Sequence, residues 1–237
     1  MQWTRIAKLS ALLIVGLAAV LGFSPVSHFV VAEVSSYQER PRPVVATSEE
    51  TRAILAAVIA KEKFEGVPPP PPAPEPGKPP PIRVLEPPQV LILEDRSACF
   101  TTDSRTSDCE QISLEDLATW PWLNSFAPLR FRRELALANQ EPHAVSLEGL
   151  PLTKVGSRAD IRGIFAKGGW WKDFHIKYPG SSGFAETSLP VLSADRKQAL
   201  VYVAYHCGGL CGVGLLLLME QVGSVWQVIK EEQLWVS

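Results

Sequence analysis

The C-terminal end of the chain has the strongest pattern of apolar and polar positions. Gly-containing segments of hairpin length separate three β-rich runs there, namely Ala199–Cys207, Val213–Glu220 and Val225–Val236. Such spacing is typical of an antiparallel meander. The middle run is apolar at almost every position as far as Met219, which predicts a central strand that is covered on both faces.

A helix is predicted to begin at Ser48. Ser48 can cap the first free amides, and Glu49 and Glu50 place negative charge at the positive end of the helix dipole. Apolar residues then recur at helical spacing, so we expect the helix to run to about Lys63 and to bury one face. These apolar residues are Ile54, Leu55, Val58, Ile59 and Phe64.

The region from Val90 to Asn139 predicts a strand and then helices. Val90–Leu93 is typical of a short buried strand, followed by Glu94 and a polar loop. One or two helices are expected between Leu114 and Asn139, interrupted at Pro121 and Pro128. Their expected core residues are Trp120, Trp122, Leu123, Phe126, Leu129, Phe131, Leu135 and Leu137.

Between this region and the meander, two further elements are expected. Ser157 is suited to cap a short helix from Arg158 to Ala166, and a strand should follow from Phe184 to Leu189. Together the elements predict an α+β fold, with helices packed on one face of an antiparallel β-meander.

The chain divides into four predicted parts. They are a signal peptide or membrane anchor at 1–32, a lead segment with an amphipathic helix at 33–66, a Pro-rich disordered spacer at 67–89, and an α+β extracytoplasmic domain at 90–237.

The N-terminus has the layout of an export signal. Arg5 and Lys8 precede an apolar run from Ala11 to Phe23, which as a helix would cover only about 20 Å of a hydrocarbon core roughly 30 Å thick. Cleavage after Ala32 and an uncleaved anchor are both open. Either one exports the body of the chain, to the periplasm, to the medium, or to the outer side of the inner membrane.

Proline supplies more than half of the residues from Val67 to Gln89. This composition is typical of polyproline II, at about 3.1 Å per residue. Three interpretations are open: a spacer across an envelope, a docking site for an aromatic groove, or a surface insertion that does not fold.

Charge and cysteine content narrow the function classes. The formal net charge is −2, so no basic excess supports binding to nucleic acid. In an oxidising compartment the four cysteines predict two local bridges, Cys99 with Cys109 and Cys207 with Cys211.

The C-terminal part resembles a domain found in uncharacterised exported bacterial proteins. The shared pattern is W-x-x-F, Y-P-x-S-x-G, a strand with Ser, A-L-V-Y-V, C-G-x-L-C-G-x-G, W-x-V and a terminal W-V-S. Here it falls on Trp171 and Phe174, Tyr178–Gly183, Ser188, Ala199–Val203, Cys207–Gly214, Trp226–Val228 and Trp235–Ser237. The resemblance covers about residues 160–237. It implies an extracytoplasmic α+β domain, and no activity or catalytic residue comes with it.

Metal and thiol chemistry have weak support. His206, Cys207 and Cys211 offer soft ligands, but adjacent strand residues point to opposite faces and no second His or Cys pair lies nearby. A C-x-x-x-C between strands also lacks the helix N-terminus that lowers a thiol pKa in redox proteins. The sequence therefore predicts no metal site and no cofactor.

Nucleophilic catalysis would need a Ser or Cys together with a His and an acid. Residues of these types are His143, His175, His206, Ser181, Ser182, Ser188, Asp95, Asp173 and Asp195. They match neither G-x-S-x-G nor H-E-x-x-H, and no phosphate-binding glycine loop is present.

Aromatic residues gather before the last strands, and two interpretations are open. They anchor a helix on the sheet, or they form a platform for a ligand or glycan with a polar rim. The candidate binding residues are Trp170, Trp171, Lys172, His175 and Tyr178.

Our first functional hypothesis is a non-catalytic envelope protein that binds or scaffolds a partner, either an envelope protein or a glycan. The alternative is a small extracytoplasmic hydrolase or thiol-redox enzyme that uses a pocket near His175 and His206.

Overall fold

The computed structural model describes residues 42–64, 89–101, 109–113, 117 and 120–237. The predicted signal or anchor and nearly all of the Pro-rich spacer lie outside the described residues. The described part has the α+β fold that the sequence predicts. Within it, no helix combines the length and the apolar character needed to cross a membrane.

A mixed sheet forms the centre of the described part of the chain. Its strands are β1 (Val44–Val45), β2 (Val90–Glu94), β5 (Thr153–Gly156), β6 (Ser181–Thr187), β7 (Val191–Leu192), β8 (Gln198–His206), β9 (Gly212–Val222) and β10 (Val225–Val236). The predicted meander is confirmed, because β9 pairs antiparallel with both β8 and β10. The sheet is not purely antiparallel, since β2 runs parallel to β5 and β6.

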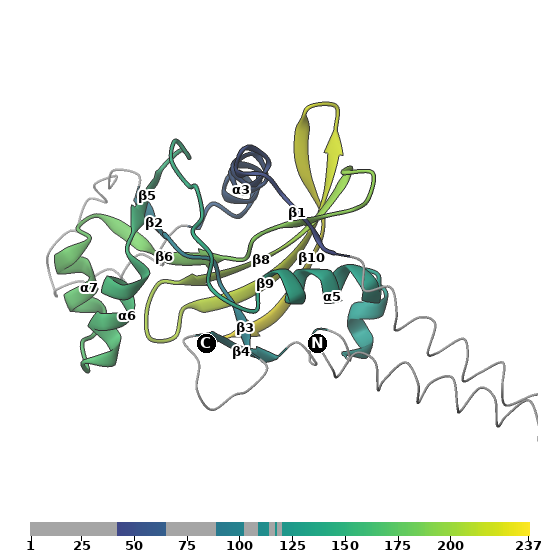
Figure 1. The fold of residues 1–237 in the computed structure, drawn as a ribbon. Coiled ribbons are helices and arrows are strands. Elements are labelled where there is room, and N and C mark those ends of the chain that lie inside the picture. The colour runs from purple at the N-terminus through teal and green to yellow at the C-terminus, as the bar shows by residue number, and fades with distance from the viewer. Residues whose placement is uncertain (1–41, 65–88, 102–108, 114–116, 118–119) are drawn as a thin grey trace, which may run out of the picture. The chain divides into compact units, whose positions relative to one another are not determined.

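Helices cover both faces of the sheet, so the prediction of a single covered face is wrong. Helix α3 (Ser48–Glu62) lies on one face and α5 (Leu129–Ala138) on the other (Figure 1). Along β8, Val201 and Val203 join the core beneath α3, whereas Tyr202 and Ala204 join the core beside α5. Successive side chains of a strand point to opposite faces of the sheet. A strand that is apolar on both faces therefore needs helices packed on each face.

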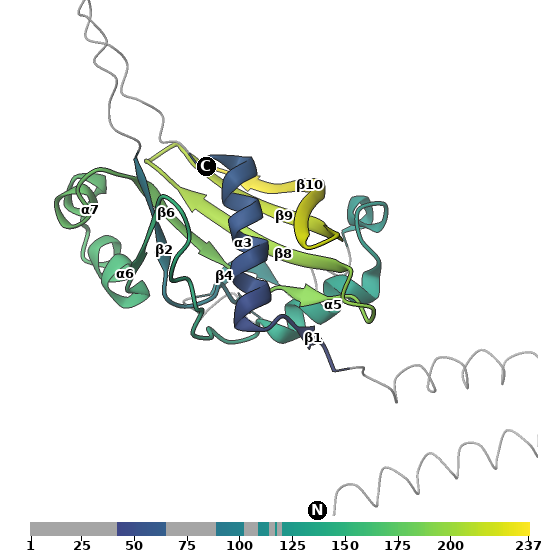
Figure 2. The ribbon, with the colours of Figure 1, turned by 90° about the horizontal axis from the view of Figure 1, so that it is seen from above.

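Helix α3 begins and ends close to the predicted positions and crosses over the strands of the sheet (Figure 2). Its N-cap is Thr47 instead of Ser48. The Thr47 N–H donates to Glu50 at 2.8 Å, and the Glu50 N–H donates to the Thr47 hydroxyl at 3.3 Å. This capping box satisfies two amides that the helix leaves unpaired. The helix buries Thr51, Ile54, Leu55 and Val58.

The two prolines divide the next helical region as predicted. Pro121 opens the 3-10 helix η1 (Pro121–Asn124), and Pro128 is the N-cap of α5. The expected core residues Leu123, Phe126, Phe131 and Leu135 are buried. Trp122 and Leu129 are exposed, because the 3-10 turn breaks the helical spacing on which their prediction depended.

Buried Arg132 was not expected from the sequence. Its guanidinium donates to the carbonyls of Leu117 and Ala127 and to the side chain of Asn124. A buried charge is tolerated when its hydrogen bonds are satisfied, and here they tie η1 to α5. Burial lowers the pKa of Arg132.

Two short helices pack at the other end of the sheet. Helix α6 (Arg158–Ala166) begins as predicted, with the Ser157 hydroxyl accepting from the Asp160 N–H. Helix α7 (Trp171–Lys177) follows it, and both pack on a separate apolar cluster. The buried members of this cluster are Ile92, Ile161, Phe174 and Phe184. The predicted strand at Phe184–Leu189 is present as β6, three residues earlier at its start.

Both predicted disulfides are present. Cys99 precedes β3 (Phe100–Thr101) and Cys109 precedes β4 (Glu110–Ser113), so this bridge joins two paired strands. The bridge between Cys207 and Cys211 closes the turn from β8 to β9. Two disulfides fit an oxidising, extracytoplasmic compartment.

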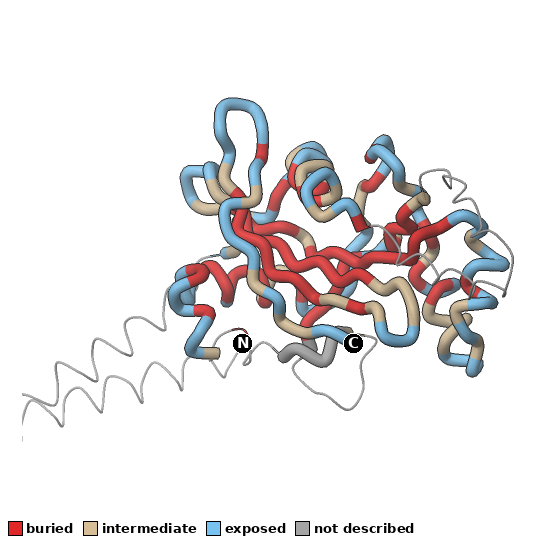
Figure 3. The backbone as a smooth tube through the Cα atoms, turned by 180° about the vertical axis from the view of Figure 1, so that it is seen from behind, coloured by how far each residue is buried: buried red, intermediate tan, exposed pale blue. Residues whose placement is uncertain are grey.

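Burial is concentrated in the middle strands of the sheet, and the tip of the β9–β10 hairpin is exposed (Figure 3). On β10, Trp235 packs directly over Gly214 of β9. The Trp235 Nε1–H donates to the Tyr202 hydroxyl at 2.8 Å. A Cβ at position 214 would come within 2.1 Å of that indole nitrogen.

Gly214→Ala should therefore displace the indole, break this hydrogen bond and lower the free energy of unfolding by about 1–3 kcal/mol. Urea unfolding followed by tryptophan fluorescence measures the change. Gly209→Ala is the matched control, because nothing lies within 4 Å of its Cβ position. Equal stabilities of the two variants would contradict the packing described here.

Candidate functional site

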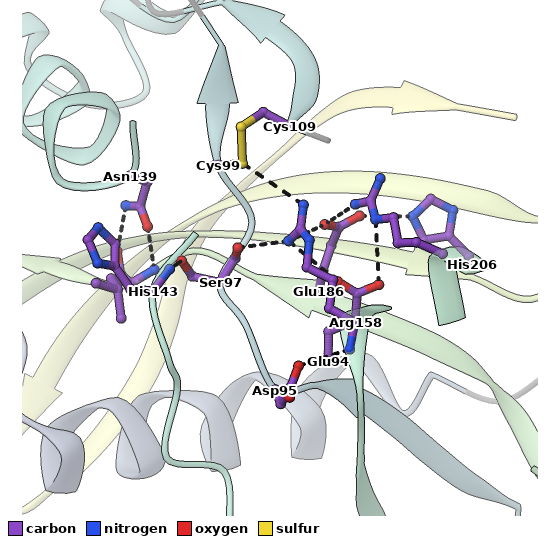
Figure 4. A network of polar contacts seen from close by, with 12 residues as sticks. Glu94, Asp95, Ser97, Cys99, Cys109, Asn139, His143, Arg158, Glu186 and His206 are labelled. Carbon is purple, nitrogen blue, oxygen red and sulfur yellow. Dashed lines mark hydrogen bonds and ion pairs between the residues drawn. A yellow bond between two sulfur atoms is a disulfide. The ribbon is translucent and has the colours of Figure 1, made fainter. Parts of the chain in front are cut away.

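A cluster of charged side chains lies between α6 and the sheet (Figure 4). Glu94 ends β2, and Glu186 lies on the neighbouring strand β6. Each follows, two positions later, an apolar residue that packs beneath α6 and α7, namely Ile92 and Phe184. Because alternate residues share a face, both carboxylates point to the side of the sheet that carries α6.

Two arginines of α6 meet these carboxylates. Arg158 Nη1 lies 3.4 Å from Glu94 Oε2 and 3.5 Å from Glu186 Oε2. Arg162 Nη2 donates to Glu186 Oε2 at 2.9 Å, and its Nε lies 3.9 Å from Glu94 Oε1. Glu94 is 0% exposed, Glu186 1% and Arg158 7%, so both carboxylates and Arg158 are sealed from solvent, whereas the side chain of Arg162 is 36% exposed.

His206 completes the cluster from the end of β8. Its Nε2 lies 3.5 Å from Glu186 Oε1. The imidazole stacks on Phe184 with ring centroids 4.7 Å apart and contacts Trp235 on its other side. These two aromatic rings fix the orientation of the imidazole toward Glu186.

Arg158 also fixes the loop that follows β2. Its backbone N–H donates to Asp95 Oδ1 at 2.9 Å, and its Nη1 donates to the Ser97 carbonyl at 2.8 Å. Its Nη2 reaches Cys99 Sγ at 3.9 Å, next to the disulfide. One side chain therefore connects α6, two strands and the loop from Asp95 to Cys99.

The same loop is held from its other side. The Ser97 N–H donates to the His143 carbonyl at 2.7 Å, and the His143 N–H donates to the Ser97 hydroxyl at 2.9 Å. Nearby, the Asn139 side chain accepts from the Leu189 N–H at 2.7 Å and donates to the Leu189 carbonyl at 3.0 Å. These contacts leave the loop little freedom to move.

Glu94 has a strongly perturbed pKa. Burial, and then the negative charge of Glu186, raise the pKa of Glu94 from 4.5 to about 8, against the opposing effect of Arg162 and Arg158. Neither carboxylate oxygen has a hydrogen-bond partner among the described residues. The raised pKa of Glu94 favours its neutral form, while Glu186 accepts from Arg162 at 2.9 Å.

An open recess of about 470 Å³ lies beside this cluster at the start of α6. Its lining includes Asp95, Arg96, Ser157, Arg158, Ala159 and Arg162. Glu94 and Glu186 lie behind the arginines and do not line it. The three arginines of the lining differ in exposure, because Arg96 is exposed, the side chain of Arg162 is 36% exposed and Arg158 is buried.

The five residues predicted from the aromatic pattern lie on and around α7, and none of them lines this recess. Trp171 and Tyr178 pack on Phe174, with ring centroids 5.3 and 5.1 Å apart. Trp170, Lys172 and His175 are not buried, and Trp170 is 72% exposed. Trp171 and Tyr178 thus anchor α7, while ligand binding at this surface stays a prediction.

Ser181 and Ser188, two of the possible nucleophiles named from the sequence, make structural contacts. Ser181 Oγ lies 3.4 Å from His175 Nδ1 but donates to the Tyr178 carbonyl at 2.6 Å. Ser188 Oγ accepts from the Tyr202 N–H. Among the described residues, no group of three or more His, Cys, Asp or Glu is placed to hold a metal ion.

Sequence reasoning missed Glu94, Glu186, Arg158 and Arg162 as a group. A weak signal was present, because Glu94 directly follows four apolar residues and Glu186 is a charged residue within a predicted strand. The two arginines, four residues apart, share one face of α6. Nothing in the sequence pairs the strands with that helix.

The chain matches no protein-family model, no curated protein sequence and no solved structure. The resemblance to exported bacterial proteins therefore stays a prediction, and the site is argued from geometry alone.

Stability should depend on pH through Glu94. A raised pKa means that the folded state holds this proton more tightly than the unfolded chain does, so the stabilisation is complete below about pH 4.5 and is lost as the pH rises through about 8. Glu94→Gln keeps the neutral form at every pH. We expect an unchanged Tm at pH 5 and a Tm higher by about 5 °C at pH 9, measured by calorimetry.

Glu148→Gln, on an exposed loop, is the control and should give the same small difference from the wild type at both pH values. A Tm difference for Glu94→Gln that does not grow between pH 5 and pH 9 would show that Glu94 is already ionised in the folded protein at low pH.

The two arginines of the cluster should differ in their contribution to stability. Arg158→Gln removes the buried partner of two carboxylates and should lower the free energy of unfolding by about 3–5 kcal/mol. Arg162 has a side chain that is 36% exposed, so Arg162→Gln should cost less. Arg130→Gln breaks an i,i+4 pair between an exposed guanidinium and the largely buried carboxylate of Glu134, and it should cost about 1 kcal/mol, the least of the three. Urea unfolding at pH 7 checks this order, and a reversed order refutes it.

Proposed function

We propose that this chain is an exported, non-catalytic binding domain, and that the recess beside α6 is the surface that meets its ligand. The observation that carries the proposal is the burial of Glu94 and Glu186, which are 0% and 1% exposed. A catalytic acid or base has to come within hydrogen-bond reach of its substrate. These two carboxylates lie behind the arginines that line the recess.

The recess has the properties of a preorganised binding surface. Asp95 and Ser157 hold the first amides of α6, and Arg158 holds the loop after β2. Side chains that are fixed in this way lose little conformational entropy when a ligand binds. The disulfide at Cys99 adds a covalent constraint at the end of the same loop.

The segments outside the described residues fit this role. The N-terminal segment would export or anchor the domain. The Pro-rich segment at 67–89 joins α3 to β2, two elements that pack in the same core, and it would offer a docking site for an aromatic groove. The partner would be an envelope protein or a glycan.

A small extracytoplasmic hydrolase is the second candidate. The raised pKa of Glu94 and the approach of His206 to Glu186 favour it, because perturbed acids cluster at catalytic sites. Structural ion-pair networks perturb pKa values in the same way, and the sealed position of the acids favours the binding role. A thiol-redox enzyme has less support, since all four cysteines are bridged and Cys99 is fully buried.

Site-specific photo-crosslinking of the exported protein tests the proposal. A photoreactive residue replaces exposed Ala159 at the recess, and in a control protein it replaces exposed Arg133 on α5. Because only the first position faces the recess, we expect an adduct of discrete mass at position 159 and none at 133.

The same adducts at both positions would contradict a recess-specific ligand. Turnover of ester, peptide or glycoside substrates that is lost in Glu186→Gln, with the fold intact by circular dichroism, would replace the binding role with the hydrolase.

A further inference from the structure

We infer that the recess binds an anionic group, a phosphate or a carboxylate, of an acidic ligand. This inference rests on the proposed binding function and names the class of ligand. Three arginines, Arg96, Arg158 and Arg162, line the recess together with one acidic residue, Asp95. Guanidinium groups match phosphate and carboxylate oxygens in charge and in geometry.

The acids around the recess are already engaged with other groups. Asp95 Oδ1 accepts from the Arg158 N–H, and Glu186 pairs with Arg158 and Arg162. Burial and Glu186 raise the pKa of Glu94, which favours its neutral form and weakens its offset of the arginine charges. Exposed Arg96 adds a further positive charge at the recess, and an anion there would balance this surplus.

The position of the arginines makes this surplus effective. Arg158 is almost fully buried and the side chain of Arg162 is 36% exposed, so solvent screens their charges less than it screens surface charges. Both arginines belong to the lining of the recess. An anion there is attracted more strongly than by arginines on a flat surface.

At the N-terminus of α6, two of the first three backbone amides are already hydrogen-bonded. The Arg158 N–H is taken by Asp95 and the Asp160 N–H by Ser157. Binding in the recess therefore depends on arginine side chains more than on free backbone amides.

Replacing Arg96 tests ligand binding without disturbing the fold. Arg96 lies in the loop after β2, bridges to Ala144 through the backbone and has an exposed side chain. It takes no part in the ion pairs of Glu94 and Glu186. Replacing Arg96 thus removes one cation from the recess and leaves the buried cluster unchanged.

The test is a titration of the full chain, with both disulfides formed, followed by calorimetry at pH 7. Inorganic phosphate is the probe in one arm and succinate in the other, with sodium chloride holding the ionic strength constant. We expect saturable binding in at least one arm, and the arm that binds identifies the group as phosphate or carboxylate. Arg96→Gln should weaken the affinity about tenfold, because one of three cations is lost.

Arg133→Gln is the matched control, since it removes an exposed arginine from α5 and should leave the affinity unchanged. Arg96→Lys keeps the charge and should lose less affinity than Arg96→Gln. Circular dichroism confirms that each variant is folded. Binding of neither anion above the chloride background, or equal affinity of the wild type and Arg96→Gln, overturns the inference.

The two proposals can fail separately. A crosslink at position 159 without anion binding keeps the binding domain and rejects an anionic ligand. Anion binding without a crosslink keeps the anion site and rejects the wider binding role.

Discussion

The buried guanidinium of Arg158 is the contact on which the arrangement of the site depends. It touches Glu94, Glu186, the Ser97 carbonyl and Cys99 Sγ. Removing a charge from water is costly, and only several well-placed partners offset that cost. These partners come from β2, β6 and the loop after β2. The Arg158 side chain can make all of these contacts only with α6 in this position on the sheet.

This charged cluster separates two apolar regions on one face of the sheet. On one side Ile92 and Phe184 pack beneath α6 and α7, and on the other Leu200 and Tyr202 pack with α5. The change from apolar to polar is visible along β6 and the residue after it. Phe184, Glu186 and then Ser188 follow one another on that face. The opposite face, beneath α3, is continuously apolar. A polar layer between apolar clusters specifies how the helices are placed, because any other placement would leave buried charges unpaired.

The same sealing limits the chemistry of the site. Burial and Glu186 raise the pKa of Glu94 and so favour its neutral form, yet solvent does not reach this carboxyl group. The partly exposed side chains of the cluster are those of Arg162 and His206. A ligand at this surface would meet these side chains and not the two acids.

The sequence alone determined the elements whose signals are local. The three strands of the meander, α3, the start of α6 and both disulfides follow from periodicity, caps, turn residues and short cysteine spacing. Tertiary structure alone decided that helices cover both faces, that β2 runs parallel to β5 and β6, and that Glu94 meets Glu186 and Arg158. These features are pairings between segments far apart in the chain. A single residue such as Glu94 has the same local pattern whether it faces water or an arginine, so only the folded arrangement selects its partner.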